Sequence, residues 1–357
     1  MDFASGDQRG IKLAQQFLAV FRQTGNRRGE ATSLSLLALF LEFQQKQTDL
    51  AIIHLKQAVN IYEAIRGDIK GLDKETQRSF VGKEEVVFTY LYAPDKQLRY
   101  IPLTALYDGK QWLIEKYQIA YLISYNLANF NPAPRSSPRT LAGALGNQKV
   151  AGLAPLPATL TEVEAIRRSL PNTQTLVERS FTASAVQQNL GGRSILHFAT
   201  HAEFNPNNPN LSYVLMGDGK KLTLPELRQW NFKGIDLVVL SACQTGVGGF
   251  GQGIEILGFG YQMQLAGAKS TISSLWAVSD GGTQVLMDSF YNSFARVKDG
   301  IVALREAQIA MIRKGENLSP DRKRSFEALR SSLPARVQGR LTHPFYWSPF
   351  IVIVNQF

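Results

Sequence analysis

The feature of this sequence that most constrains its fold is a regular alternation of strand-like and helix-like segments from residue 140 to residue 354. Runs such as Leu237-Val238-Val239-Leu240 are apolar without a break, and segments with helical periodicity separate them. Unbroken apolar strands between helices predict an α/β fold with a mainly parallel sheet and helices on both faces. We expect strands at 141–145, 175–177, 194–199, 235–241, 270–276 and 350–354, and helices at 160–169, 182–190, 253–265, 281–295 and 300–313.

Residues 1–75 have a different, helical pattern and form a first expected domain, ahead of the domain at 76–357. The segment around Ala19 is echoed 39 residues later around Ala58. Helix pairs that repeat near this period resemble tetratricopeptide repeats, and an ordinary helical hairpin is the alternative. About one and a half repeats are present, whereas a stable array needs at least ~3. We therefore expect these helices to pack on the domain that follows.

Between the two regions the sequence favours short strands, expected near 86–92, 99–106, 112–115 and 118–124. A segment rich in Pro and Ser at 131–138 then predicts a linker or a surface loop.

Composition narrows the class of protein. The chain carries 39 basic and 29 acidic residues, a net charge of +10, but the basic residues are too dispersed to predict nucleic-acid binding. No apolar run reaches the ~18–20 residues that cross a bilayer, and the N-terminus lacks the pattern of a secretion signal. The single cysteine excludes an intrachain disulfide and a zinc site made of cysteines alone. We expect a cytoplasmic protein without membrane contact.

Two reactive side chains follow neighbouring predicted strands at the point where each strand ends. His201 follows the strand at 194–199, with His197 four residues earlier inside it. Cys243 follows the strand at 235–241 and precedes a glycine-rich stretch at 246–253. Because active sites of parallel sheets lie beyond the carboxyl ends of the strands, we expect His201 and Cys243 at the same edge.

This pair fits nucleophilic catalysis by a thiolate. An adjacent imidazole activates the Cys243 thiol and later protonates the leaving amine. The backbone amides of Ala202 and Cys243 are candidates for an oxyanion hole. The alternative for Cys243 is a small buried apolar residue in a strand, which is the commoner role of a lone cysteine.

Five ordered motifs resemble the CHAT domain family, and the resemblance covers residues 95–357. They are His197-Phe-Ala-Thr-His201, Leu240-Ser-Ala-Cys243-Gln-Thr-Gly246, Leu265-Ala-Gly-Ala-Lys-Ser-Thr271, Ser274-Leu-Trp-Ala-Val-Ser-Asp280 and His343-Pro-Phe-Tyr-Trp-Ser-Pro-Phe350.

The resemblance implies a caspase-like and separase-like fold, often found behind tetratricopeptide repeats, and a cysteine endopeptidase activity. It implies that His201 and Cys243 are catalytic, and that His197 is a packed strand residue. The region ahead of Leu98-Arg99-Tyr100-Ile101-Pro102-Leu103 is shorter than usual in the family, so the second domain is expected to be shortened at its N-terminal part. Ala202 stands where many relatives have Gly.

Caspase-like enzymes build the pocket for the residue before the scissile bond (P1) around the segment that here contains Trp276 and Asp280. An acidic Asp280 would select P1 Arg or Lys by a charge-assisted contact. The alternative is that Asp280 caps the helix expected at 281–295.

Two other motifs are weaker. Gly246-Val-Gly248-Gly-Phe-Gly251 matches the dinucleotide-binding pattern, but residues 266–275 lack the acidic residue that such a site needs. His197 and His201 have a metalloprotease spacing without its Glu, in a strand rather than a helix. We therefore expect no cofactor and no metal.

The expected partner is a protein substrate or regulator, bound through the helical repeats. A catalytically silent scaffold is the alternative function.

Overall fold

A computed structural model describes residues 3–45, 47–69, 89–92, 101–122, 137–147, 149–205, 208–241, 244–245, 254–276, 278 and 280–354. The chain divides into two compact units, Met1–Val87 and Phe88–Phe357.

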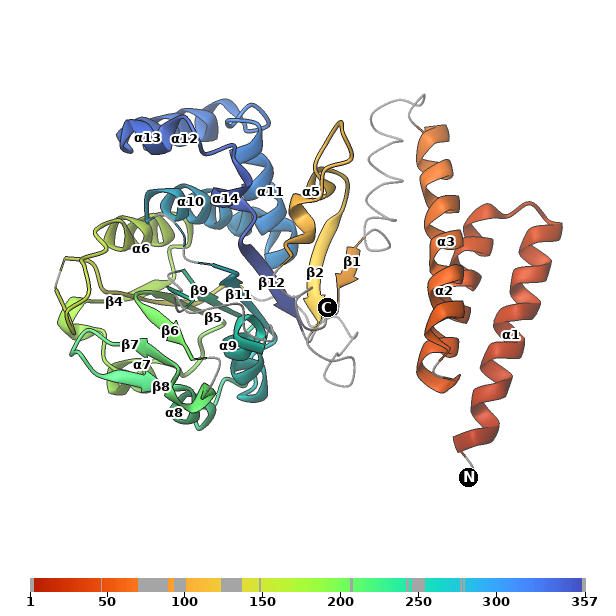
Figure 1. The fold of residues 1–357 in the computed structure, drawn as a ribbon, viewed down its shortest axis with the longest axis horizontal. Helices are drawn as coiled ribbons and strands as arrows, with labels where there is room; N and C mark the ends of the chain where they lie inside the picture. The colour runs from red at the N-terminus through yellow and green to blue at the C-terminus, as the bar shows by residue number, and fades with distance from the viewer. Residues whose placement is uncertain are drawn as a thin grey trace. The chain divides into compact units, whose positions relative to one another are not determined.

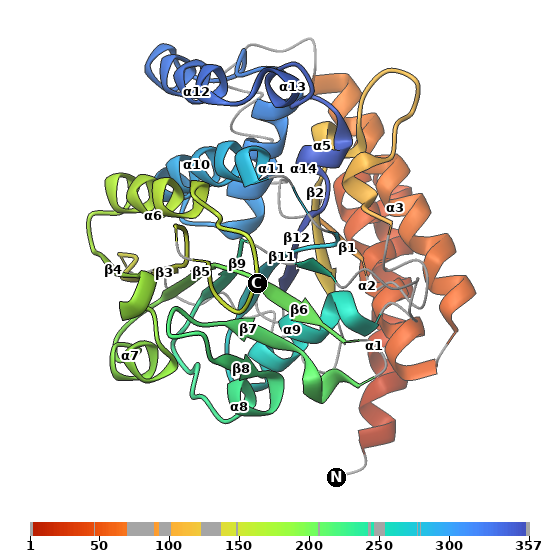
Figure 2. The same ribbon diagram turned by 60° about the vertical axis from the view of Figure 1, so that its left-hand side comes forward.

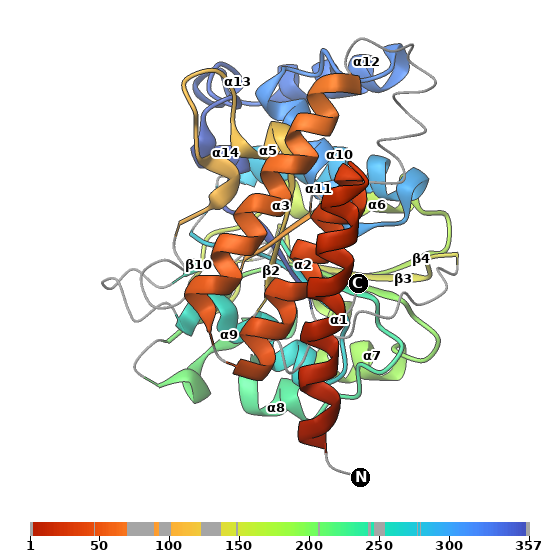
Figure 3. The same ribbon diagram turned by 90° about the vertical axis from the view of Figure 1, so that its right-hand side faces the viewer.

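The first unit contains three helices that pack side by side, α1 (Phe3–Gln23), α2 (Arg27–Gln45) and α3 (Thr48–Ile69) (Figure 3). Small and branched apolar residues of the three helices are buried: Ala14, Leu18, Ala31, Leu34, Ala38, Leu41, Ala51 and Ala58. The side chain of Asn26 accepts the Gly29 N–H at 2.9 Å and caps α2. The expected helices are present, and their relation to tetratricopeptide repeats stays a prediction.

The second unit is built on an eight-stranded sheet with the order β1-β2-β12-β11-β9-β5-β3-β4 (Figure 1). Neighbouring strands are parallel except β11 and β12, so two parallel blocks meet at one antiparallel pair. The strands are β1 (Thr89–Tyr92), β2 (Gln118–Leu122), β3 (Thr140–Ala144), β4 (Thr173–Val177), β5 (Ile195–Ala199), β9 (Leu237–Leu240), β11 (Ser270–Ser274) and β12 (Phe350–Val354).

Helices cover both faces of this sheet, which confirms the predicted fold class. Alternate strand residues face opposite ways, so Val239 packs in one core cluster and Val238 in the other. The first cluster includes residues of α6 (Ala158–Ser169), α10 (Asp280–Val297) and α11 (Gly300–Ile312). The second includes residues of α7 (Ala183–Gln188), α8 (Leu224–Arg228) and α9 (Ile254–Leu265).

A second, four-stranded sheet with the order β10-β6-β7-β8 lies next to the ends of β5 and β9 (Figure 2). Its strands are β6 (Ala202–Phe204), β7 (Tyr213–Leu215), β8 (Lys221–Thr223) and β10 (Gln244–Thr245). The described residues also contain α12 (Pro320–Ser332), α13 (Ala335–Gln338), α14 (Pro344–Trp347), and the 3-10 turns η3 (Leu103–Ala105), η5 (Glu178–Ser180) and η6 (Pro209–Leu211).

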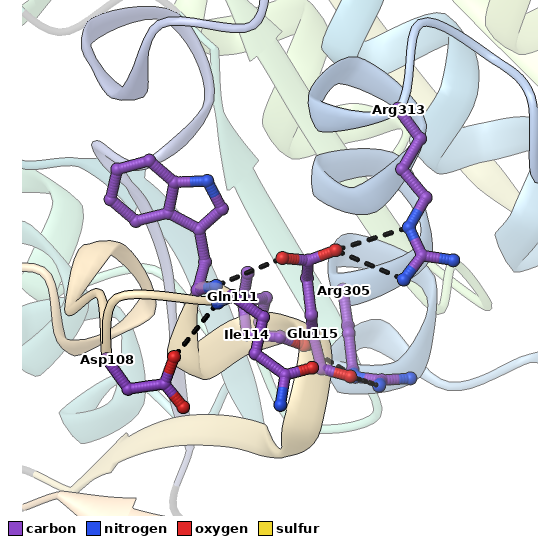
Figure 4. A network of polar contacts seen from close by, with 7 residues as sticks. Asp108, Gln111, Ile114, Glu115, Arg305 and Arg313 are labelled. Carbon is purple, nitrogen blue, oxygen red and sulfur yellow. Dashed lines mark hydrogen bonds and ion pairs between the residues drawn. The ribbon is translucent and has the colours of Figure 1, made fainter.

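Two short segments differ from the expected strands. The stretch 112–115 belongs largely to a helical turn, α5 (Leu113–Lys116), and the described part of 99–106 contains η3. Tertiary contacts hold α5 (Figure 4). The Glu115 carboxylate accepts the Trp112 N–H at 3.0 Å, and Arg305 of α11 donates to the carbonyls of Ile114 and Glu115 at 2.9 and 2.8 Å. The contact between Trp112 and Glu115 is local, but Arg305 comes from a distant helix, and the local sequence does not record that part of the support.

Candidate functional site

His201 lies in the short connection between β5 and β6, beyond the carboxyl end of β5. Its side chain is buried, and Nε2 lies 2.8 Å from the Ala154 carbonyl oxygen. A carbonyl can only accept a hydrogen bond, so Nε2 carries the hydrogen. In the neutral ring, Nδ1 is then the proton acceptor. The protein therefore fixes both the tautomer and the orientation of this histidine.

Ala242, Cys243 and the glycine-rich motif at 246–251 lie outside the described residues, but Ser241 and Gln244, which flank Ala242 and Cys243, are described. Ser241 directly follows β9, and Gln244 begins β10. β10 pairs in parallel with β6, and Gln244 is opposite Glu203 in the register. The backbone just after Cys243 therefore runs beside the backbone just after His201 and Ala202. This pairing, together with the adjacency of β5 and β9, brings the two predicted strand ends to one edge of the sheet.

Asp280 is the first residue of α10, and its Oδ2 accepts the Ala158 N–H at the start of α6 at 3.2 Å. Burial raises the pKa of the Asp280 carboxyl, and the charge of Glu162 raises it further. The hydrogen bond from Ala158 and the charge of His201 act in the opposite direction on this pKa. Asp280 thus interacts electrostatically with His201, at the edge where both were predicted.

The other two predicted site residues are at the same edge. Ala202 begins β6, is buried, and is opposite Val214 of β7. Trp276 follows β11, and its indole N–H donates to the Phe345 carbonyl at 3.3 Å while the two rings stack with centroids 6.4 Å apart. The motif around 274–280 and the motif at 343–350 therefore meet in space, although the oxyanion and pocket roles stay predictions.

A chain of buried polar side chains beneath this edge was not predicted. Glu162 Oε1 lies 2.5 Å from the Ser241 hydroxyl and 3.0 Å from His197 Nε2. His197 Nδ1 lies 2.9 Å from the Tyr291 hydroxyl. Each of the four residues is at most 3% exposed. The carboxylate and Nε2 are at ion-pair distance without hydrogen-bond geometry, so we treat this contact as electrostatic.

The described residues contain no group of three or more His, Cys, Asp or Glu side chains that could hold a metal ion. His197, the first histidine of the metalloprotease-like spacing, is fully buried in β5. Among the described helices, none is both long and apolar enough to cross a membrane.

Comparisons with known proteins give one family match and several structural likenesses. A family model described as the CHAT domain matches residues 72–355. Among solved structures, gingipain R, titled an Arg-specific cysteine proteinase, aligns over 81% of this chain and 69% of its own, with 10% identity and a TM-score of 0.43. The pro- and mature domain complex of Porphyromonas gingivalis RgpB gives 11% identity, a TM-score of 0.42, and covers 81% of this chain and 71% of that one.

Separase from Saccharomyces cerevisiae, solved with securin, aligns over 91% of this chain and 20% of its own, with 10% identity and a TM-score of 0.45. This chain therefore spans about a fifth of the length of that separase. A comparison with curated protein sequences finds no significant match.

Proposed function

Because the chain belongs to the CHAT domain family, we propose that it is a caspase-like cysteine endopeptidase with Cys243 as nucleophile and His201 as acid and base. The observation that carries this proposal is the register of β6 and β10, which runs the backbone after Cys243 beside the backbone after His201. The orientation of His201 adds support, because the contact of Nε2 with the Ala154 carbonyl places the hydrogen on Nε2 and makes Nδ1 the proton acceptor of the neutral ring.

The reaction follows from that tautomer. His201 Nδ1 takes the thiol proton, and the Cys243 sulfur attacks the peptide carbonyl carbon to form a carbon–sulfur bond. When the carbon–nitrogen bond breaks, His201 returns the proton to the leaving amine, and water then hydrolyses the thioester. In this proposal the backbone amides of Ala202 and Cys243 stabilise the negative charge on the carbonyl oxygen.

We further propose that cleavage follows a basic P1 residue, with Asp280 as the acidic group of the pocket and Trp276 as part of its wall. Asp280 is partly buried, and its carboxyl interacts electrostatically with His201. A carboxylate in such a place forms a strong, charge-assisted contact with Arg or Lys. Its bond to Ala158 uses Oδ2 and leaves Oδ1 for a ligand.

The nucleophile is tested with an Arg-directed acyloxymethyl ketone, followed by intact-mass measurement. Wild type should gain one label, while Cys243→Ala should gain none and His201→Ala should react far more slowly. Equal labelling of wild type and Cys243→Ala would reject the nucleophile. A folded wild type that neither reacts nor cleaves, with a protein partner present, would favour the scaffold.

The pocket is tested separately with Asp280→Asn. Asparagine keeps an oxygen that can accept the Ala158 N–H but removes the charge, so we expect kcat/KM for Arg and Lys substrates to fall at least about tenfold. The variant should keep its reaction with iodoacetamide, a neutral reagent that needs no pocket. An unchanged kcat/KM would remove Asp280 from substrate selection.

A further inference from the structure

The buried carboxylate of Glu162 is the feature that the proposed reaction leaves unexplained. Glu162 is 3% exposed, and a buried carboxylate is costly unless it is paired and hydrogen-bonded. The partners that the described residues provide are the hydroxyl of Ser241 and the imidazole of His197. An apolar side chain at this position would avoid the cost, since buried ionic groups are weak contributors to stability.

The two partners of Glu162 belong to the strands that carry the proposed catalytic pair. Ser241 directly follows β9 and lies two residues before Cys243. His197 lies within β5, four residues before His201. A single carboxylate oxygen on α6 therefore contacts both strands, 2.5 Å from one partner and 3.0 Å from the other.

The hydrogens in this cluster converge on Glu162. The negative charge of Glu162 beside Nε2 favours the His197 tautomer that carries its hydrogen on Nε2, on the side of the carboxylate. In that tautomer Nδ1 accepts from the Tyr291 hydroxyl, 2.9 Å away. Ser241 donates to Glu162 from the other side. Tyr291 thus orients His197 by a hydrogen bond. Glu162 in turn contacts His197 electrostatically and accepts a hydrogen bond from Ser241.

The same segment of chain also contacts the edge residues directly. The Ala154 carbonyl accepts from His201, the Ala158 amide donates to Asp280, and Glu162 contacts Ser241. These three positions are spaced four residues apart, so within α6 Ala158 and Glu162 lie on one face of the helix. Residues 154–162 therefore form one continuous support for the edge of the sheet.

We propose that Glu162 is a positioning residue, which fixes the end of β9 through Ser241 and the middle of β5 through His197. By holding both strands it sets the separation of Cys243 and His201. This inference rests on the proposed function, because it assumes that these two residues act as a pair.

The lone cysteine makes the proposal measurable without a known substrate. Iodoacetamide reacts with the thiolate, and the chain has one Cys, so its alkylation rate reports Cys243 alone. Ser241→Ala removes the contact with Glu162 but changes no charge. We expect its alkylation rate at pH 7 to fall about tenfold, which corresponds to a rise of about one unit in the pH midpoint of the reaction.

A double-mutant cycle identifies the contact responsible. In a Glu162→Leu background, Ser241→Ala should change the alkylation rate less than about twofold, because its partner is already gone. Glu162→Gln, which keeps an acceptor for the hydroxyl, should restore most of the rate lost in Glu162→Leu. Equal effects of Ser241→Ala in both backgrounds would overturn the proposal, and so would an unchanged rate in the wild-type background.

Two matched controls separate positioning from general loosening of the fold. Ser274 ends the neighbouring strand β11, is 2% exposed, and its hydroxyl has no partner in the described structure, so Ser274→Ala should leave alkylation unchanged. Glu164 is on the same helix as Glu162 but exposed, so Glu164→Leu should also have no effect. If Glu162→Leu does not fold, Ser241→Ala decides the question alone.

His201→Ala distinguishes a failure of this inference from a failure of the proposed function. A lower alkylation rate in His201→Ala with an unchanged rate in Ser241→Ala rejects Glu162 as a positioning residue and leaves the catalytic pair in place. An unchanged rate in His201→Ala rejects the pair itself, and the positioning role with it.

Discussion

At the scale of single residues, the charge of Asp280 has a proposed function and also lowers the stability of the folded protein. Burial raises the pKa of its carboxyl, so the folded protein binds this proton more tightly than the unfolded chain does. The resulting stability is fully present below the ordinary carboxyl pKa of about 4 and is lost as the pH rises through the raised value. At neutral pH the ionised Asp280 therefore weakens the fold.

Asp280→Asn should for this reason be more stable than wild type at pH 7–8, by on the order of 1–2 °C in Tm. The difference should shrink as the pH falls towards 4, and thermal melts over this range measure it. Asp321→Asn, a change at an exposed carboxylate, is the control and should show no such trend. A lower Tm for Asp280→Asn than for wild type at pH 8 would contradict the conclusion that ionised Asp280 destabilises the fold.

Glu162 and Glu164 show what the sequence could not predict at this scale. Both lie on the same predicted helix two residues apart, yet one side chain is 3% exposed and the other 57%. Helical spacing puts Glu162 nearer than Glu164 to the apolar positions Val163 and Ile166, but the buried polar partners of its carboxylate depend on how α6 packs, which no local pattern records. His201 and Asp280 could be predicted because strand ends and motif order mark them in the sequence itself.

At the scale of elements, the central strands could be predicted and the peripheral turns could not. β5, β9 and β12 are mainly apolar runs whose burial on both faces is visible in composition. The helical turn α5 depends on Arg305, far along the chain, and the small sheet consists of strands of two or three residues. The order of the strands in the sheet could not be predicted from the sequence either, because it depends on pairing between distant segments.

Gly143 of β3 tests the packing of the sheet. A Cβ at this position would lie 2.1 Å from the ring of Phe181, which is fully buried. We expect Gly143→Ala to lower the free energy of unfolding by about 1–3 kcal/mol, because overpacking forces the ring or the backbone to shift. The midpoint of urea denaturation measures the change.

Gly191→Ala provides the comparison for Gly143, since a Cβ at Gly191 would have no heavy atom within 4 Å. This variant should unfold at the same urea concentration as wild type or slightly above it. Equal midpoints for both glycine variants would show that β3 does not pack against Phe181 as described.

At the scale of the whole molecule, the division into two compact units predicts that each unit unfolds in its own cooperative transition. Among the described residues, both main core clusters of the α/β unit consist of residues from 105 onward. A chain of residues 88–357 should therefore keep a single cooperative transition in calorimetry, with a Tm within about 2–4 °C of the corresponding transition in the full chain. A gradual melt of the shorter chain would show that the helices belong to the same folding unit.

The position of β12 has a consequence for synthesis of the protein. β12 joins the block of β1 and β2 to the block that begins with β11, yet residues 350–354 leave the ribosome after every other strand of the sheet. A nascent chain that stalls earlier presents two open strand edges, one on β2 and one on β11, which are sites for aggregation or for recognition by chaperones. The ribosome must therefore complete residues 350–354 before the two blocks can close into one sheet.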